Sequence, residues 1–398
     1  MVYTLNSIDL SFLDDDPSVA AHGEDSGASV LIGSRRSLIL ENGLNLESGA
    51  FLPSVDVAYE TWGVLNAAGD NAILVCHALT GDAHASGKYS PEDSRLGWWD
   101  PLIGPGRAFD TRRFFVVCVN VLGGCQGTTG PSSINPETGK PYGSAFPQVT
   151  VRDMVKAQYE LLQGIGVTRL AAVAGGSLGG MQVLEWVVTY PELVDAAIPI
   201  GTALAHTAQG IAYNLVGREA IALDPDWQRG DYYGTGRVPV RGLSIARMVG
   251  MITYQSEESM RRKFDRERVD ASPSAYYDPA SCFQIESYLY YQGEALVSRF
   301  DANSYLTLTR AMDLHDVGYG RGGIDEALRH IPHSVRTLVI GIDSDILFPP
   351  HHQREIADRL TALNKHATYC EIASPWGHDA FLIEYGQLTE TITRFLNV

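Results

Sequence analysis

The segment Leu-Ala-Ala-Val-Ala-Gly-Gly-Ser-Leu-Gly-Gly, residues 170–180, decides the fold of this chain. Leu170–Ala174 is an apolar run of strand length, and we expect Leu178–Val188 to form the next helix. The residues that join them, Gly175–Gly179, match the pattern G-x-S-x-G. In that pattern a sharp strand-to-helix turn lifts the serine hydroxyl clear of the sheet, and small flanking residues let neighbouring elements pass closely. The segment therefore predicts that Ser177 is a nucleophile.

The same residues allow two other interpretations. A glycine-rich turn between a strand and a helix needs no chemistry at all, because Gly and Ser are common residues in turns. A phosphate-binding loop would place a lysine directly after its last glycine, and here Gly180 and Met181 follow Gly179 instead. The position between a strand and a helix favours the nucleophile.

Short apolar runs alternate with helical patterns on both sides of this turn. Continuous apolar runs indicate strands covered on both faces, as in a parallel sheet, and apolar residues at helical spacing indicate the crossover helices. This order predicts an α/β fold with a mostly parallel sheet flanked by helices. The expected strands are Val55–Thr61, Ala72–Cys76, Phe114–Val119, Leu170–Ala174, Ala196–Ile200, Val335–Ile340 and Thr368–Ile372, with further helices at Val151–Ile165 and near 352–363 and 380–396.

The alternation stops between residues 205 and 325. This segment is rich in Tyr, Arg, Glu and helix-forming stretches and contains no convincing buried strand. We interpret it as a helical lid inserted into one sheet, so the core domain is discontinuous and comprises residues 31–204 and 326–398. Residues 1–30 are polar, acidic and aperiodic, and we interpret them as an N-terminal extension.

Charge and composition exclude several classes of function. The 398-residue chain has a formal net charge of −17, which repels nucleic acids and anionic membranes. It has no apolar stretch near 18 residues and no basic segment before an apolar one at its N-terminus. We therefore expect no membrane span, no signal peptide and a cytoplasmic location. The five cysteines form no C-x-x-C pair, so we expect neither a disulfide framework nor a structural zinc site.

On an α/β-hydrolase fold, the partners of such a serine follow it in the order Ser, Asp or Glu, His. The acid should end the strand Val335–Ile340, where Asp343 and Asp345 are both candidates and one is a turn residue. The base should lie on the loop between the last strand and the last helix. His378 has this position.

An oxyanion hole needs two backbone N–H groups. The first should come from Leu178, because it follows the nucleophile at the N-terminus of a helix, where the helix dipole favours negative charge. The second should come from the loop after the strand Ala72–Cys76, and Leu79 is our candidate. His77 precedes the nucleophile in the chain, so we interpret it as structural.

Blocks of sequence between about residue 40 and residue 398 carry a family resemblance. They are His77–Gly81, Gly97–Asp100, Asn120–Ser133, Gly175–Gln182, Arg299–Tyr305, Ser344–Pro349 and Gly377–Leu382. These blocks resemble the homoserine O-acetyltransferase family. The resemblance implies an acyltransferase that carries acetyl from acetyl-CoA to L-homoserine through an acyl-enzyme, on the route to methionine. It implies a homodimer built through the lid, and no metal or other cofactor.

The resemblance also implies roles for particular residues. It makes Asp345 the acid, because the acid of the family lies in the motif that here reads Ser344–Pro349. It implies that Arg218 grips the homoserine carboxylate and that Asp379 holds the amino group, and a guanidinium and a carboxylate suit these partners. The chain departs from the family pattern at Gly217, where relatives usually carry Gln.

The motifs leave the exact reaction open. A homoserine O-succinyltransferase or a serine O-acyltransferase of the same family would share the catalytic core, and a serine esterase would share the nucleophile, acid and base. A non-catalytic binding protein on the same scaffold is disfavoured by the intact Ser–Asp–His set. The sequence does not indicate which residues bind coenzyme A.

Overall fold

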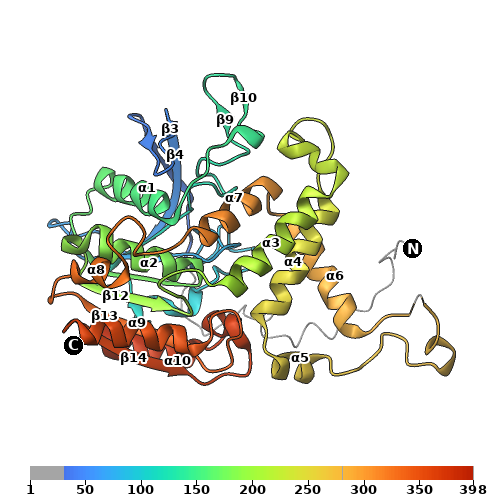
Figure 1. Ribbon diagram of the computed structural model, residues 1–398. Helices are drawn as coiled ribbons and strands as arrows, with labels where there is room; N and C mark the ends of the chain where they lie inside the picture. Colours follow the sequence, from blue (N-terminus) through green and yellow to red (C-terminus); the bar gives the residue numbers. More distant parts are fainter. Residues whose placement is uncertain (1–30, 280, 398) are drawn as a thin grey trace.

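A mixed eight-stranded sheet forms the centre of the computed structural model, which describes residues 31–279 and 281–397 (Figure 1). The first two strands of the sheet pair antiparallel, as do the second and third, and all later neighbours pair parallel. The predicted extension at residues 1–30 lies outside the described residues. In order across the sheet, the strands are β1 (Arg36–Leu40), β4 (Val55–Trp62), β8 (Phe115–Val119), β5 (Ala72–Cys76), β11 (Leu170–Gly176), β12 (Ala196–Ile200), β13 (Arg336–Ile342) and β14 (His366–Ile372).

The mostly parallel sheet is therefore confirmed, and the seven predicted strands are present with shifts of one or two residues at their ends. Strands β5 and β12 are buried along their whole length, which explains why they read as continuous apolar runs. Strand β1 was not predicted, because it lies at the edge of the sheet and only its last residue, Leu40, is buried. Short strand pairs lie outside the main sheet: β2 (Leu44–Asn45) with β3 (Phe51–Leu52), β6 (Ile103–Gly104) with β7 (Phe109–Asp110), and β9 (Ile134–Asn135) with β10 (Lys140–Pro141).

Helices cover both faces of the sheet and create two apolar cores. One face is packed by α1 (Val151–Gly164), α2 (Leu178–Thr189) and α9 (Pro350–Ala362), and the other by α10 (Tyr385–Leu396). Helix α1 begins with a capping box in which Thr150 and Asp153 satisfy each other's backbone N–H groups. The helix α8 (Ile324–Arg329) adds to the first face.

A group of helices is inserted between β12 and β13. The described part of residues 205–323 contains helices and two isolated β-bridges, but no β-strand. The helices are α3 (Ala208–Ala222), α4 (Val240–Tyr254), α5 (Glu257–Lys263), α6 (Gln284–Val297) and α7 (Ala302–Asp313). Helices α3, α4 and α6 lie side by side away from the sheet (Figure 1). Helix α7 instead packs its Tyr305 and Leu308 into the core of the sheet.

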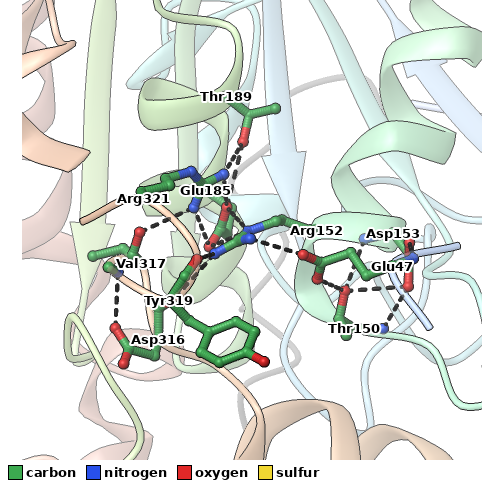
Figure 2. Close-up of polar contacts among 11 residues, drawn as sticks. Glu47, Thr150, Arg152, Asp153, Glu185, Thr189, Asp316, Val317, Tyr319 and Arg321 are labelled. Atoms are coloured by element: carbon green, nitrogen blue, oxygen red, sulfur yellow. Dashed lines mark hydrogen bonds and ion pairs between the residues drawn. The ribbon is translucent and has the colours of Figure 1, made fainter. Parts of the chain in front are cut away.

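A buried ion network fastens the end of this insertion to the helices beneath it (Figure 2). Glu185 of α2 is 2% exposed and pairs with Arg152 of α1 at 3.2 Å and with Arg321 at 2.9 Å. Arg152 also pairs with Glu47 at 2.7 Å and donates to the carbonyl oxygen of Tyr319 at 2.8 Å. One carboxylate thus joins α1, α2 and the segment that leaves the insertion.

We predict that Glu185→Gln lowers the free energy of unfolding by about 3 kcal/mol, because it leaves two poorly hydrated guanidinium groups without their shared carboxylate. Urea denaturation of the variant measures the loss. The control is Glu192→Gln, which changes an exposed glutamate and should alter stability by less than about 0.5 kcal/mol. Equal losses in the two variants would contradict a special role for the network.

Candidate active site

Ser177 occupies the sharp turn between β11 and α2. Its backbone has φ 60° and ψ −123°, a conformation that a non-glycine residue adopts only when its surroundings enforce it. The Ser177 N–H donates to the carbonyl oxygen of Ile200 on β12 at 3.0 Å, which holds the turn against the next strand. A Cβ atom on Gly175 or Gly179 would overlap the carbonyl oxygen of Cys76. The glycines of the motif are therefore required by the close approach of β5.

Asp345 and His378 form a buried pair beside this turn. The His378 Nδ1 lies 2.6 Å from an oxygen of Asp345, and the side chains are 3% and 0% exposed. The other oxygen of Asp345 accepts from the backbone N–H groups of Leu347 and Phe348, each at 2.8 Å. With its carboxylate fixed in this way, Asp345 selects the tautomer that carries the proton on Nδ1 and leaves a lone pair on Nε2.

The free side of His378 faces the same cavity as Ser177. Among the described residues the Nε2 atom has no hydrogen-bond partner, so a hydrogen bond between it and Ser177 is not formed in this state. Such contacts are often loose without substrate and tighten when it binds. The structure therefore brings the three predicted residues together, in an arrangement that suits a nucleophile, a base and an acid.

The structure distinguishes Asp343 from Asp345, both of which the sequence allowed as the acid. Asp343 is exposed and its carboxylate accepts from the backbone N–H of Ser374 at 2.9 Å, which is the contact of a turn residue. Only Asp345 contacts His378.

Burial and charge act in opposite directions on His378. Burial lowers the pKa of its imidazole, but the charge and hydrogen bond of Asp345, together with the charge of Asp379, outweigh that effect. The pKa of His378 is therefore raised above its usual value. A more basic imidazole is better able to accept the proton of a serine hydroxyl.

The two predicted oxyanion donors follow the neighbouring strands β5 and β11. Leu178 begins α2, where the first N–H groups of a helix have no intrahelical acceptor. Leu79 follows β5 and lines the cavity that contains Ser177. His77 lies next to it but is engaged elsewhere: it accepts from the N–H of Val121 at 3.1 Å and contacts the carbonyl oxygen of Ala78 at 2.8 Å. This supports the structural interpretation of His77.

A cavity of about 640 Å³ opens above Ser177 between the sheet and the inserted helices. Its size is typical of a small-molecule site. Asp379 lines it, as expected of a substrate-binding residue. The other carboxylates and guanidinium groups that line it are Asp82, Asp93, Arg95, Arg247 and Arg299.

Arg218 is not brought to this cavity, contrary to the role that the family resemblance implied. It lies on α3 and pairs with Asp313 of α7 at 2.6 Å, and the two side chains are 15% and 2% exposed. Both members of this pair are therefore used to join two inserted helices.

The cavity is also lined by Arg247 and Tyr254 of α4, which were not predicted from the sequence. The guanidinium of Arg247 lies 5.6 Å from the centre of the Tyr254 ring, and that ring lies 6.0 Å from the ring of His378. The available signal was an arginine within the otherwise small and apolar stretch Ser244–Met251. In the part of the chain that the structure describes, no group of His, Cys, Asp or Glu is arranged to hold a metal ion.

The class of protein follows from this geometry together with a family comparison. The family model of the alpha/beta hydrolase fold matches residues 71–385 of the chain. A nucleophile turn, a later acid and a final histidine in this order are the features of that class. Across residues 31–279 and 281–397, no helix has the length and apolar character needed to cross a membrane.

Curated relatives define the family more closely. A homoserine O-acetyltransferase of Moorella thermoacetica is 58% identical over 353 residues, which cover 89% of this chain and 93% of the relative. Another, from Symbiobacterium thermophilum, is 57% identical over 89% of this chain and 92% of the relative. The chain belongs to the homoserine O-acetyltransferase family.

Solved structures agree with this membership and add a second enzyme class. The crystal structure of a homoserine O-acetyltransferase from Bacillus anthracis aligns with a TM-score of 0.87 at 32% identity, over 92% of this chain and 98% of that one. The crystal structure of an esterase aligns with a TM-score of 0.84 at 31% identity, over 92% of this chain and 100% of that one. The fold is therefore shared by transferases and esterases.

We predict that Asp345→Asn damages activity far more than Asp343→Asn. Only the first removes the charge that orients His378, and a comparable change in serine proteases costs about 10⁴ in kcat. The measurement is the rate at which each variant releases 4-nitrophenolate from 4-nitrophenyl acetate. Similar losses in the two variants would show that the contact between Asp345 and His378 is not the important one.

Proposed function

We propose that this protein transfers acetyl from acetyl-CoA to the hydroxyl group of L-homoserine by a ping-pong mechanism. One observation carries the proposal beyond family membership. The cavity that contains Ser177 also contains a guanidinium, Arg247, and a carboxylate, Asp379, so it offers partners for both charges of an amino acid. An esterase substrate needs neither group.

In the first half-reaction, Ser177, His378 and Asp345 act as a catalytic triad. His378 accepts the proton of Ser177 through Nε2, and the serine oxygen attacks the thioester carbonyl carbon. The N–H groups of Leu79 and Leu178 stabilise the oxyanion. The carbon–sulfur bond breaks, the thiolate of coenzyme A takes the proton from His378, and the acetyl group remains on Ser177.

The second half-reaction reverses these roles with a new nucleophile. His378 accepts the proton of the homoserine hydroxyl, whose oxygen attacks the ester carbonyl of the acetylated serine. The bond to the Ser177 oxygen breaks, His378 returns the proton to Ser177, and O-acetylhomoserine leaves. No cofactor takes part in this sequence, and acetyl-CoA serves as a cosubstrate.

Acceptor recognition is assigned to Arg247 and Asp379. The Nε of Arg247 is buried without a hydrogen-bond partner among the described residues, and its guanidinium lies over Tyr254 beside His378. A buried donor without a partner is costly and is relieved by an anionic ligand. Arg218 also has a buried nitrogen without a hydrogen-bond partner among the described residues, but only Arg247 lines the cavity. We therefore assign the homoserine carboxylate to Arg247.

Water competes with homoserine for the acetylated serine, because a triad of this kind also serves hydrolysis. An esterase, whose reaction uses water, has the same fold. Holding the amino acid by both charges raises the effective concentration of its hydroxyl beside His378, and the inserted helices narrow the access of water. The balance between transfer and hydrolysis therefore rests on Arg247 and Asp379.

We further propose a cytoplasmic homodimer that acts in methionine biosynthesis and is joined through the inserted helices. Helix α3 exposes Leu215 and Val216, which are 49% and 53% exposed, and α4 exposes Ile245 and Ile252, which are 47% and 48% exposed. We infer that these side chains form one apolar surface on the lid, because the two helices are neighbours. A second copy of the chain would bury it.

An acyl-enzyme test distinguishes this function from its alternatives. After brief exposure to acetyl-CoA without acceptor, mass spectrometry should find one added acetyl group on the protein and none on Ser177→Ala. Burial raises the pKa of Cys125 to about 11, so its thiol should not compete. Acetyl found on Cys125 would contradict the assignment of the nucleophile.

The same preparation should release its acetyl group to homoserine much faster than to water. Acetyl-CoA and succinyl-CoA, each tested with homoserine and with serine, identify the donor and the acceptor. Acetate release at one rate with or without an amino acid would identify an esterase instead.

Arg247→Ala and Arg218→Ala form a matched pair of variants on the inserted helices. We predict that Arg247→Ala lowers kcat/KM for homoserine by about 10- to 150-fold, the value of a charge-assisted contact. Arg218→Ala removes the nearest cation from the buried Asp313, which keeps Asn214 at 2.9 Å and Arg310 at 3.8 Å. It should therefore lower the free energy of unfolding by up to about 3 kcal/mol and affect acceptor kinetics little. Steady-state kinetics and urea denaturation of both variants measure these effects. If Arg218→Ala instead lowered kcat/KM for homoserine and Arg247→Ala did not, Arg218 would be the residue that binds the homoserine carboxylate.

A further inference from the structure

Three arginines, Arg95, Arg247 and Arg299, contribute to the lining of the cavity. None of the ion pairs among the described residues includes Arg95, Arg247 or Arg299. This arrangement is unusual in a chain with a formal net charge of −17, where carboxylates are abundant. Like charges gathered in one cavity repel one another, and an anionic ligand relieves that repulsion. Arg247 accounts for the acceptor carboxylate, which leaves two cations without a function.

The depth of the cavity separates these two cations from the reacting groups. Ser177 and His378 form its floor and are 5% and 2% exposed. Arg95 and Arg299 are both exposed, so they lie at its mouth. A ligand that reaches both regions must be long, with an anionic end outside and a reactive end inside.

The mouth is formed from two parts of the chain. Arg95 belongs to the segment 93–98 beside the core sheet, and Arg299 follows α6 in the insertion. Arg299 is held in place because its guanidinium donates to the carbonyl oxygen of Thr80 at 2.8 Å, and its own carbonyl oxygen accepts from Gln126 at 2.9 Å. The remaining N–H groups of this guanidinium are available to a ligand, since arginine carries five.

Two carboxylates near the mouth are engaged by backbone groups. Asp93 accepts from the N–H groups of Tyr89 and Ser90 at 3.0 and 2.8 Å, and Asp82 accepts from that of His84 at 2.9 Å. These contacts direct the two carboxylates toward backbone N–H groups, as is typical of turn residues. They leave the guanidinium groups as the groups best placed to meet an anion.

We propose that Arg95 and Arg299 bind the phosphate groups of the acyl-CoA donor at the mouth of the cavity. The inference rests on the proposed function and identifies where its cosubstrate is held. Guanidinium groups bind phosphate oxygens through paired, charge-assisted hydrogen bonds. The flexible arm of the donor then runs inward, and its thioester carbonyl reaches Ser177 and the N–H groups of Leu79 and Leu178.

The test compares two donors that differ in their phosphates. Acetyl-CoA carries them, whereas S-acetyl-N-acetylcysteamine has the same thioester and none. We expect Arg95→Ala to lower the ratio of kcat/KM for acetyl-CoA to kcat/KM for the short donor by about 10-fold, the lower end of a charge-assisted contact because the site is exposed. Arg95→Lys should restore part of the ratio, since it keeps the charge but loses the planar fork. Arg36→Ala, an exposed arginine on β1 outside the cavity, is the control and should leave the ratio as in the wild type.

Product inhibition provides a second measurement. In Arg95→Ala, the inhibition constant of coenzyme A should rise by about 10-fold, while that of pantetheine, which has no phosphate, should stay near the wild-type value. Sodium chloride should raise KM for acetyl-CoA more steeply in the wild type than in the variant. Arg299→Ala should lower the rate with both donors, because Thr80 loses a hydrogen bond, and should lower it further with acetyl-CoA.

An unchanged donor ratio in Arg95→Ala, or equal losses on both donors in Arg299→Ala, would overturn the phosphate site. Neither result would affect the proposed reaction, because the wild type would still acetylate homoserine. Failure of the wild type to make O-acetylhomoserine from either donor would instead contradict the proposed function itself.

Discussion

The backbone turn at Ser177 is the constraint on which the rest of the structure depends. A residue with φ 60° at the end of β11 is tolerated because glycines on both sides let β5 and β12 approach it closely. The sheet order places β5, β11, β12 and β13 side by side, so their carboxyl ends meet at one edge. The loop of Leu79, Ser177 and Asp345 are therefore gathered by the sheet itself, and only His378 has to be added from the last loop.

The inserted helices complete a site that the sheet leaves open. They supply Arg247 and Tyr254 from α4 and Arg299 from the end of α6, and these residues face Ser177 across the cavity. The C-terminal end of the insertion is held by Glu185, whose carboxylate binds Arg152 and Arg321 (Figure 2). Since α2 carries both Glu185 and the turn of Ser177, one helix links the anchor of the lid to the nucleophile.

The shared fold of transferases and esterases shows why chemistry has to be argued from side chains. An acetylated serine reacts with water or with an alcohol by the same steps, so the triad does not choose between them. The choice depends on what holds the acceptor. A cavity with a guanidinium and a carboxylate on its walls suits a zwitterion, and this is the physical difference on which the assignment to an amino-acid acceptor rests.

The sequence by itself determined the elements whose signals are local. Buried strands of the parallel sheet are continuous apolar runs, the G-x-S-x-G turn needs its glycines at fixed positions, and the order of Ser177, Asp345 and His378 follows the chain. The pattern alone left Asp343 and Asp345 open, because both follow one strand and only the direction of each side chain separates them. Only the tertiary structure decided that Arg218 joins two helices while Arg247 lines the cavity. Both lie on helices of the insertion with weak apolar periodicity, and the face that a helix turns toward the site is set by packing between helices, which a single sequence does not encode locally.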